Sequence, residues 1–338
     1  MDAGLDRMPA ALPPELSVAL SRAKTPKIAI VLASYNGAAN LRAQLDSYLL
    51  QTLAPALVIV SDDGSQDASR AVVADFAASH PAVPLQLLEG PRQGAAQNFL
   101  HLLRAVPDQM DMVAFSDQDD VWLPEKLARG AATLQAAQLD AGSTPGLVLG
   151  ASLVCDGDLG NPRRSALPKR PAGFRHALVQ NIAGGNTMLL NRTATRLLQA
   201  CAADVQAAGA ALVVHDWWAY QIITGCGGRV IFDPEPSLLY RQHSGNLIGA
   251  NTGVRAKVLR LKLMVLGRFQ EWNSLNIRAL SLSAQRLTPQ NRQLLADFSA
   301  LRQARFCRRL WLLHKAGLYR QGLQGRLSLW LAAALGKI

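Results

Sequence analysis

The chain contains few cysteines, and their spacing excludes two common covalent frameworks. Only four occur among the 338 residues, Cys155, Cys201, Cys226 and Cys307, and no two of them form a Cys-x-x-Cys pair. A disulfide-rich secreted domain would need more cysteines, and a cysteine zinc site would need them at closer spacing. The pattern predicts free thiols in a reducing compartment.

Long apolar runs are missing as well. Although 49% of the residues are hydrophobic, no run approaches the roughly 18 residues that a membrane-spanning helix requires. The N-terminus has neither the basic nor the apolar region of a signal peptide, so we expect none. With 17% charged residues, the composition is typical of a folded protein and excludes a disordered or fibrous chain.

Acidic residues are scarce in one part of the chain only. Residues 251–338 contain 16 Lys and Arg but just Glu271 and Asp297, a net charge of +14, whereas residues 1–250 carry −3. Basic and apolar residues alternate there, as in 258–266 and 308–313, which is typical of helices that lie in a lipid interface. We expect contact with an anionic membrane surface, with packing on the main domain as the alternative. No zinc-finger or RRM signature supports nucleic-acid binding.

Short apolar runs alternate with helical patterns in the first half of the chain. Strands are predicted at 27–33, 56–61, 85–88 and 112–116, and helices at 38–51, 67–79, 95–105 and 125–139. This alternation is typical of a parallel sheet with helices on both faces. Further strands are predicted at 147–155, 187–190 and 230–232, and further helices at 194–205 and 217–224.

Three parts follow from these patterns. Residues 1–26 are expected to form an irregular leader, and residues 27–250 an α/β domain with a mostly parallel, Rossmann-like sheet. Residues 251–338 form a basic, helical appendage, which is the part expected to associate with a membrane. We therefore look for the functional site in the α/β domain.

Polar residues follow the predicted strands, where open α/β sheets bind their ligands. The groups at these positions are Ser34, Tyr35 and Asn36 after the first strand, Asp62 and Asp63 after the second, Gln97 and Asn98 at the third helix, and Asp117, Asp119 and Asp120 after the fourth strand. Up to five carboxylates would then crowd around one crevice. Because like charges repel, this arrangement implies a bound cation.

Asp117 and Asp119 are the best candidates for holding that cation. In an extended stretch their side chains project to the same side, and carboxylate oxygens at this spacing suit Mg²⁺ or Mn²⁺ together with substrate phosphates. The chain has neither a P-loop nor a G-x-G-x-x-G fingerprint. A helix cap at Asp117–Asp120 and a simple Asx turn at Asp62–Ser65 are the structural alternatives.

Two further clusters have less specific patterns. His215, Asp216, Trp217 and Trp218 are consecutive at the start of a predicted helix, where the aspartate could also cap the helix and the tryptophans could be core residues. Residues 240–246 include Arg241 and His243, which could contact an anionic ligand or stabilise a loop.

Taken in order, these clusters resemble the family 2 glycosyltransferases of the GT-A fold, and most of all the rhamnosyltransferase-like members of bacterial surface-polysaccharide synthesis. The motifs that carry the resemblance are Ala33–Gly37, Gln44–Ser47, Ser61–Asp67, Phe115–Trp122, His215–Trp218 and Tyr240–His243. The resemblance covers about residues 27–249. It does not cover the leader or the basic C-terminal region.

The resemblance implies a role for each matched residue. Ser34, Tyr35, Asn36, Asp62 and Asp63 would hold the nucleotide, together with Gln97 and Asn98, although the family often has a basic residue where Gln97 stands. Asp117 and Asp119 match the DxD motif, the first meeting the ribose and the second the metal. Asp216 matches the catalytic base. His215, Trp217, Trp218, Arg241 and His243 would lie near the acceptor sugar.

The activity implied by the resemblance is inverting, metal-dependent glycosyl transfer. The donor would be dTDP-rhamnose, and the acceptor a lipid-linked glycan or polysaccharide at the inner, cytoplasmic face of the membrane. A UDP-hexose donor is the nearest alternative. A non-catalytic module that binds sugar nucleotides or polysaccharide is the alternative from another class.

Overall fold

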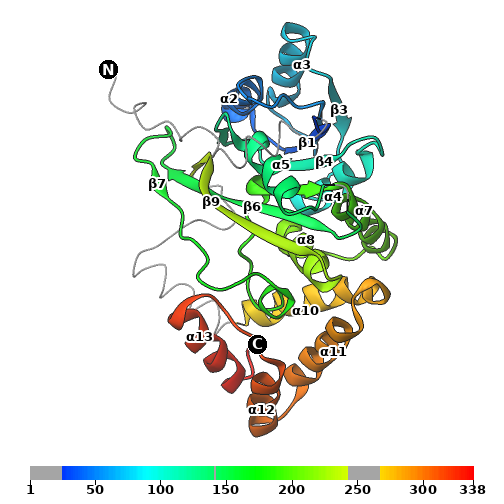
Figure 1. The fold of residues 1–338 in the computed structure, drawn as a ribbon, viewed down its shortest axis with the longest axis vertical. Helices are drawn as coiled ribbons and strands as arrows, with labels where there is room; N and C mark the ends of the chain where they lie inside the picture. Colours follow the sequence, from blue (N-terminus) through cyan, green and yellow to red (C-terminus); the bar gives the residue numbers. More distant parts are fainter. Residues whose placement is uncertain (1–24, 141, 243–266) are drawn as a thin grey trace. The chain divides into compact units, whose positions relative to one another are not determined.

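The computed structural model describes residues 25–140, 142–242 and 267–338 (Figure 1). These residues form two compact units. The first contains the described residues up to Leu167, Gly184–Arg196 and those from Ile231 to residue 242. The second contains Pro168–Ala183, Leu197–Val230 and the described residues from 267 onward. The predicted leader lies almost wholly outside the described residues, and the boundary at residue 250 stays a prediction.

One sheet organises the first unit, with nine strands among the described residues. Its parallel part has the order β3-β2-β1-β4, formed by β1 (Ile28–Ser34), β2 (Leu57–Asp62), β3 (Leu85–Glu89) and β4 (Met112–Ser116). Beyond β4 the order continues as β8-β6-β9-β5, with β7 paired to β6. These strands are β5 (Val121–Trp122), β6 (Gly146–Cys155), β7 (Arg163–Arg164), β8 (Leu189–Asn191) and β9 (Arg229–Arg241).

Helices follow the parallel strands as expected. They are α2 (Ala38–Leu49), α3 (Ser69–Ser79), α4 (Ala95–Ala105) and α5 (Lys126–Ala136). The next helical segments are α6 (Phe174–Ala177), η1 (Gly185–Thr187), α7 (Arg192–Ala207) and α8 (His215–Gly225). The C-terminal helices are α10 (Arg268–Leu282), η2 (Ala284–Arg286), α11 (Pro289–Gln303), α12 (Phe306–Ala316) and α13 (Gly322–Ala334).

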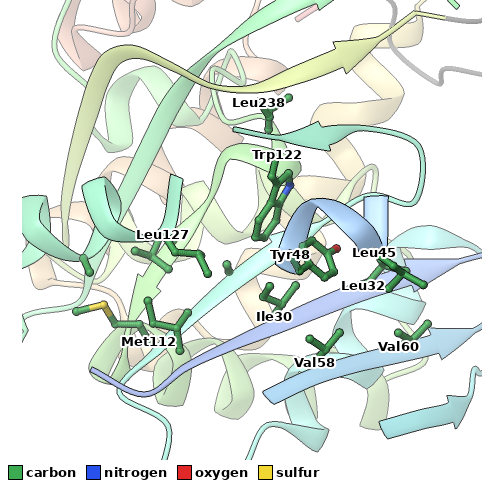
Figure 2. Packing of buried hydrophobic residues seen from close by; sticks show 14 of the residues in the cluster. Ile30, Leu32, Leu45, Tyr48, Val58, Val60, Met112, Trp122, Leu127 and Leu238 are labelled. Atoms are coloured by element: carbon green, nitrogen blue, oxygen red, sulfur yellow. The ribbon is translucent and has the colours of Figure 1, made fainter. Parts of the chain in front are cut away.

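The parallel strands β1, β2 and β4 are buried on both faces because each is apolar at almost every position, whereas the edge strand β3 is partly exposed. On one face, Ile30 and Leu32 pack with α2, α3 and α5 in a cluster that contains Tyr48 and Trp122 (Figure 2). The rings of Tyr48 and Trp122 lie 4.8 Å apart. On the other face, Phe115 of β4 packs on Phe99 of α4 at 5.3 Å. This two-sided burial anchors the carboxyl ends of the strands.

The α/β class and the helical character of residues 268–334 are confirmed. The main difference is in β9, which was predicted only at 230–232 and continues to Arg241 through Pro234 and Pro236. Both prolines lack a backbone N–H. Because backbone groups two residues apart in a strand face the same way, both missing donors lie on the same side of the strand. The opposite side can still pair, so alternating prolines did not end the strand.

We expect Tyr48→Phe to lower the free energy of unfolding by about 1 kcal/mol. The Tyr48 hydroxyl is buried and donates to Ser116 Oγ at 2.6 Å, one residue before the acidic loop. Urea denaturation followed by circular dichroism measures the change. Tyr35→Phe is the matched control, because its ring is 56% exposed and should leave the midpoint unchanged. Equal midpoints for wild type and Tyr48→Phe would contradict this assignment.

Candidate active site

The carboxyl ends of the parallel strands meet at one edge of the sheet. Ser34 of β1 is level with Asp62 of β2, and Asp62 is level with Glu89 of β3. On the other side, Leu32 of β1 is level with Ser116 of β4. The sheet therefore brings together the loops that follow β1, β2 and β4, which contain most of the predicted nucleotide-binding residues.

The side chain of Gln118 joins the β4 loop to the β1 loop. Its Oε1 accepts from the Tyr35 N–H at 2.8 Å, and its Nε2 donates to the Tyr35 carbonyl at 3.0 Å. The Gln118 side-chain amide thus bonds to both backbone groups of Tyr35, as the backbone of a neighbouring strand would. A Cβ at Gly37 would lie 2.2 Å from Gln118 Oε1, so a side chain there would displace the Gln118 amide. The Tyr35 ring itself is 56% exposed.

Asn36 joins the β1 loop to the β2 loop. Its N–H donates to Ser65 Oγ at 2.9 Å, and its Oδ1 accepts from the Gln66 N–H at 2.8 Å. Asn36 has a φ of 47°, a left-handed conformation that asparagine tolerates better than most residues. Asn36 is therefore fixed by the protein itself. Ser34 is buried, and its Oγ has no hydrogen-bond partner among the described residues.

The adjacent carboxylates of Asp62 and Asp63 have different partners. Asp62 accepts from the Ser65 N–H at 3.0 Å and from the Ser65 hydroxyl at 2.5 Å. These contacts match the turn given in the sequence analysis as the structural alternative for Asp62–Ser65. Asp63 accepts from the N–H groups of Arg92 at 2.6 Å and Gly94 at 2.7 Å. Both aspartates are buried, at 2% and 7% exposure. They stabilise two loops at the sheet edge, and their contact with a nucleotide stays a prediction.

Asn98 was predicted to contact the nucleotide, and the structure gives it another role. Its side chain is 1% exposed, accepts from Ser61 Oγ at 2.6 Å and donates to the Ser61 carbonyl at 2.9 Å. With both ends of the amide engaged inside the protein, Asn98 holds α4 against β2. Gln97, its neighbour, is partly exposed.

The DxD segment does not continue β4 as an extended strand. The backbone bends at Gln118 and Asp119, so strand alternation does not apply there, and the placing of the Asp117 and Asp119 carboxylates on one side stays a prediction. Both aspartates are partly exposed. Among the described residues, no three His, Cys, Asp or Glu side chains are arranged to hold a metal by themselves. A cation here would need oxygen ligands from a substrate.

Asp120 anchors this loop, a role that sequence reasoning missed. It is fully buried, accepts from Asn186 Nδ2 at 2.5 Å and accepts from the Arg241 N–H at 3.1 Å. Burial, and then the neighbouring charge of Asp119, raise the pKa of Asp120 to about 7. Burial likewise lowers the pKa of Lys126 to about 7. Lys126 Nζ donates to the Asn186 carbonyl at 2.8 Å, so the two buried groups share Asn186.

Arg241 was predicted to meet an anionic ligand, and the structure places it inside the protein. It is 8% exposed, and its Nε donates to the Asp119 carbonyl at 2.9 Å. Another nitrogen of the guanidinium donates to the Gly157 carbonyl. The end of β9 is thereby tied to the backbone of the DxD segment. His243, its predicted companion, lies outside the described residues.

Asp216 lies in the second unit, in the first turn of α8. The N-cap of this helix is Val214, so Asp216 is not the cap. Its Oδ1 accepts from the Trp217 N–H at 2.5 Å and from Asn181 Nδ2 at 3.1 Å. Asn181 is itself held by Ala183, whose N–H donates to Asn181 Oδ1 at 2.9 Å. Asn181 is a positioning residue that the sequence motif did not reveal.

The two tryptophans that follow Asp216 are internal. Trp217 and Trp218 are 3% and 1% exposed, so they are core residues of α8, and their place near an acceptor sugar stays a prediction. The Trp217 indole donates to the Ala177 carbonyl at 2.6 Å. Burial lowers the pKa of His215 to about 3, which keeps its imidazole neutral near pH 7. These side chains orient the helix that carries Asp216.

The sequence comparisons identify the family. Residues 29–176 match the glycosyl transferase family 2 profile. This segment is a glycosyl transferase family 2 domain. Over 237 residues the chain is 26% identical to the dTDP-rhamnosyl transferase RfbG of Shigella flexneri. The matched region covers 69% of this chain and 78% of RfbG. The chain is therefore a glycosyltransferase, and the predicted GT-A-type α/β fold agrees with these matches. The non-catalytic alternative is not supported.

Two solved structures are also similar to this chain. The mannosyltransferase PcManGT from Pyrobaculum calidifontis, in complex with GDP-Man and Mn²⁺, is 18% identical with a TM-score of 0.47, covering 95% of this chain and 92% of that chain. S. aureus TarS 1-349, in complex with UDP-GlcNAc, is 15% identical with a TM-score of 0.49, covering 92% of this chain and 90% of that chain. No helix among the described residues is long and apolar enough to span a membrane.

We expect the free energy of unfolding to fall as the pH drops from about 6.5 to about 4, in part through His176. This residue is buried beside α8, with Nδ1 3.0 Å from the Tyr220 hydroxyl, and burial lowers its pKa to about 4. Within this window the unfolded chain binds the proton that the folded chain excludes, which costs up to ~3 kcal/mol.

Urea midpoints measured across this pH range test the assignment. His176→Gln should flatten the dependence on pH, whereas His314→Gln, at an exposed position, should keep the wild-type slope. The same slope for His176→Gln and wild type would show that His176 titrates normally in the folded protein.

Proposed function

We propose that this glycosyltransferase transfers rhamnose from dTDP-rhamnose, with inversion, to a lipid-linked or polysaccharide acceptor in cell-surface glycan synthesis. The similarity to a dTDP-rhamnosyl transferase over 69% of the chain is the observation that carries the choice of donor. A UDP-hexose donor used by the same residues is the second candidate. Both donors present a nucleoside diphosphate to the same edge of the sheet.

The nucleotide would bind at the loops after β1, β2 and β4. Tyr35 offers an exposed ring against which a base can pack, and Asp117 offers a partly exposed carboxylate for the ribose hydroxyls. The loop that bears Tyr35 is held on both sides, by Gln118 and by the contacts of Asn36. Because these contacts hold the loop in place before the nucleotide binds, less conformational entropy would be lost on binding.

The residues of the DxD segment fit a divalent cation that also binds the donor diphosphate. Asp120 is buried and bonded to Asn186 and Arg241, and the match to the DxD motif assigns the cation to Asp119. One or two carboxylates with substrate phosphates are the usual Mg²⁺ or Mn²⁺ ligands. When bound, the cation would stabilise the negative charge that develops on the leaving diphosphate.

Asp216 would act as the base of a single displacement. Its carboxylate accepts the proton of the acceptor hydroxyl while the acceptor oxygen bonds to the anomeric carbon. The bond from that carbon to the diphosphate oxygen breaks, and the nucleoside diphosphate leaves on the opposite face. One displacement inverts the anomeric centre. Asn181 orients the carboxylate through Oδ1.

The reaction would take place at the inner, cytoplasmic face of the membrane, with the protein bound peripherally. The net charge of +14 in residues 251–338 supports this setting, because anionic headgroups attract basic segments. A lipid-linked acceptor would be held at the same surface.

We expect Asp216→Asn to lower the rate of transfer by about 10²–10⁴-fold, because the amide cannot accept the proton. The dissociation constant of the nucleoside diphosphate should stay nearly unchanged. The measurements are product formation from dTDP-rhamnose, with UDP-hexoses tested in parallel, and calorimetric titration of dTDP. Asp158→Asn removes the same charge from an exposed position and is the control. Full activity of Asp216→Asn would refute the base assignment.

We expect Asp119→Ala to abolish the dependence of dTDP affinity on Mn²⁺, because the ligand that joins cation and protein is lost. Calorimetric titrations with Mn²⁺ and with a chelator measure the difference. The control is Asp75→Ala, which removes an exposed carboxylate from α3 and should retain the wild-type response. Tighter dTDP binding with Mn²⁺ in Asp119→Ala would exclude this residue as the ligand.

A further inference from the structure

Exposed apolar side chains gather at the C-terminal end of the chain. Of the eleven large hydrophobic residues that are exposed among the described residues, seven lie on or just after α12 and α13. They are Phe306, Trp311, Leu323, Leu327, Trp330, Leu331 and Leu335. Exposure of single apolar residues is ordinary, but such a concentration on two neighbouring helices marks an interaction surface.

The exposed residues of α13 form a continuous stripe. Leu323, Leu327 and Leu331 follow one another at intervals of four, so they lie on one side of the helix. They are 69%, 61% and 45% exposed. The opposite side is also apolar and is packed, with Leu329 and Ala333 at 3% and 0% exposure. A helix that is apolar on both sides needs a second apolar environment.

The neighbouring helix α12 adds aromatic and basic side chains. Trp311 is 57% exposed, and Lys315 Nζ lies 5.2 Å from the centroid of its ring. Arg305 and Arg308 are exposed at the start of the helix, and Arg326 is exposed on α13. Tryptophan beside lysine or arginine is typical of elements that lie at the level of lipid headgroups.

The charge of this segment favours an anionic surface over a second copy of the chain. No Asp or Glu follows Asp297, whereas residues 298–338 contain eight Lys and Arg. Two copies meeting through this face would bring like charges together without a carboxylate from the same segment to balance them. An anionic bilayer supplies both the negative charge and the apolar layer that the leucine stripe requires.

We propose that α12 and α13 dock the protein on an anionic bilayer, with Leu323, Leu327 and Leu331 entering the boundary between headgroups and acyl chains. Trp311 and Trp330 lie at headgroup level, and the exposed basic residues contact lipid phosphates. The inference deepens the proposed function and rests on it for its biological setting. It assigns the membrane contact to described helices, independently of the basic residues at 255–262.

Vesicle co-sedimentation of the full chain tests the proposal. The wild type should bind vesicles of equimolar phosphatidylcholine and phosphatidylglycerol, bind phosphatidylcholine alone more weakly, and be partly released by salt. The triple variant Leu323→Ser, Leu327→Ser, Leu331→Ser should bind at least about a hundredfold more weakly. Leu49→Ser with Leu50→Ser changes exposed leucines of the first unit and should bind as the wild type does.

Cys307 provides a second readout. It is the exposed one of the four cysteines and lies on α12 between Phe306 and Arg308. An environment-sensitive fluorophore attached there should shift its emission to the blue when the anionic vesicles are added. The triple variant, labelled in the same way and with unchanged circular dichroism, should show no shift.

Three results would overturn the proposal. They are no binding of the wild type to anionic vesicles, equal binding of wild type and triple variant, and a wild-type dimer that the triple variant converts to monomer while neither binds vesicles. An assay of sugar transfer to a water-soluble acceptor, without lipid, tests the proposed function independently of membrane docking. If vesicles bind but no transfer occurs, the donor or the catalytic assignment fails and the docking surface stands.

Discussion

The structure of the acidic loop depends on burying one of its carboxylates. Asp117, Asp119 and Asp120 are close in the sequence, so their carboxylates repel one another when all are charged. Asp120 resolves this by entering the protein, where Asn186 and the Arg241 N–H donate to it. Burial, and then the charge of Asp119, raise its pKa, which favours the neutral form of this carboxyl group. The other two carboxylates stay at the surface, where a cation and a substrate can reach them.

Other polar residues of the candidate site also form hydrogen bonds within the protein. Asp62, Asp63 and Asn98 look like ligand-binding residues in the sequence, yet each makes short hydrogen bonds inside the protein. These contacts fix the loops after β2 and the start of α4. Gln118 does the same for Tyr35 through both ends of its amide. Polar residues next to a ligand site therefore serve mainly to hold backbone in place, and few side chains remain for the ligand itself.

The C-terminal helices differ from the sheet in how they bury their apolar residues. The sheet unit buries its apolar residues on both faces, as Ile30 and Phe115 illustrate. Helix α13 packs only one of its two apolar sides, and no carboxylate follows Asp297 to balance the basic residues. In our proposal, catalysis and membrane attachment lie in parts of the chain with opposite charge balance. An enzyme whose acceptor is held in a membrane benefits from this arrangement, because docking raises the local concentration of the acceptor.

The sequence alone determined the α/β alternation, the helical C-terminal region and the family, because apolar periodicity and short motifs are local properties. It also located Asp117, Asp119 and Asp216 as acids at the ends of regular elements. The tertiary structure decided which acids are buried, that Asn186 and Arg241 hold Asp120, and that Asn181 holds Asp216. It likewise made Trp217 and Trp218 core residues and β9 a long strand through two prolines. These contacts join residues far apart in the sequence, as with Asp120 and Arg241, and burial depends on what packs from outside the segment.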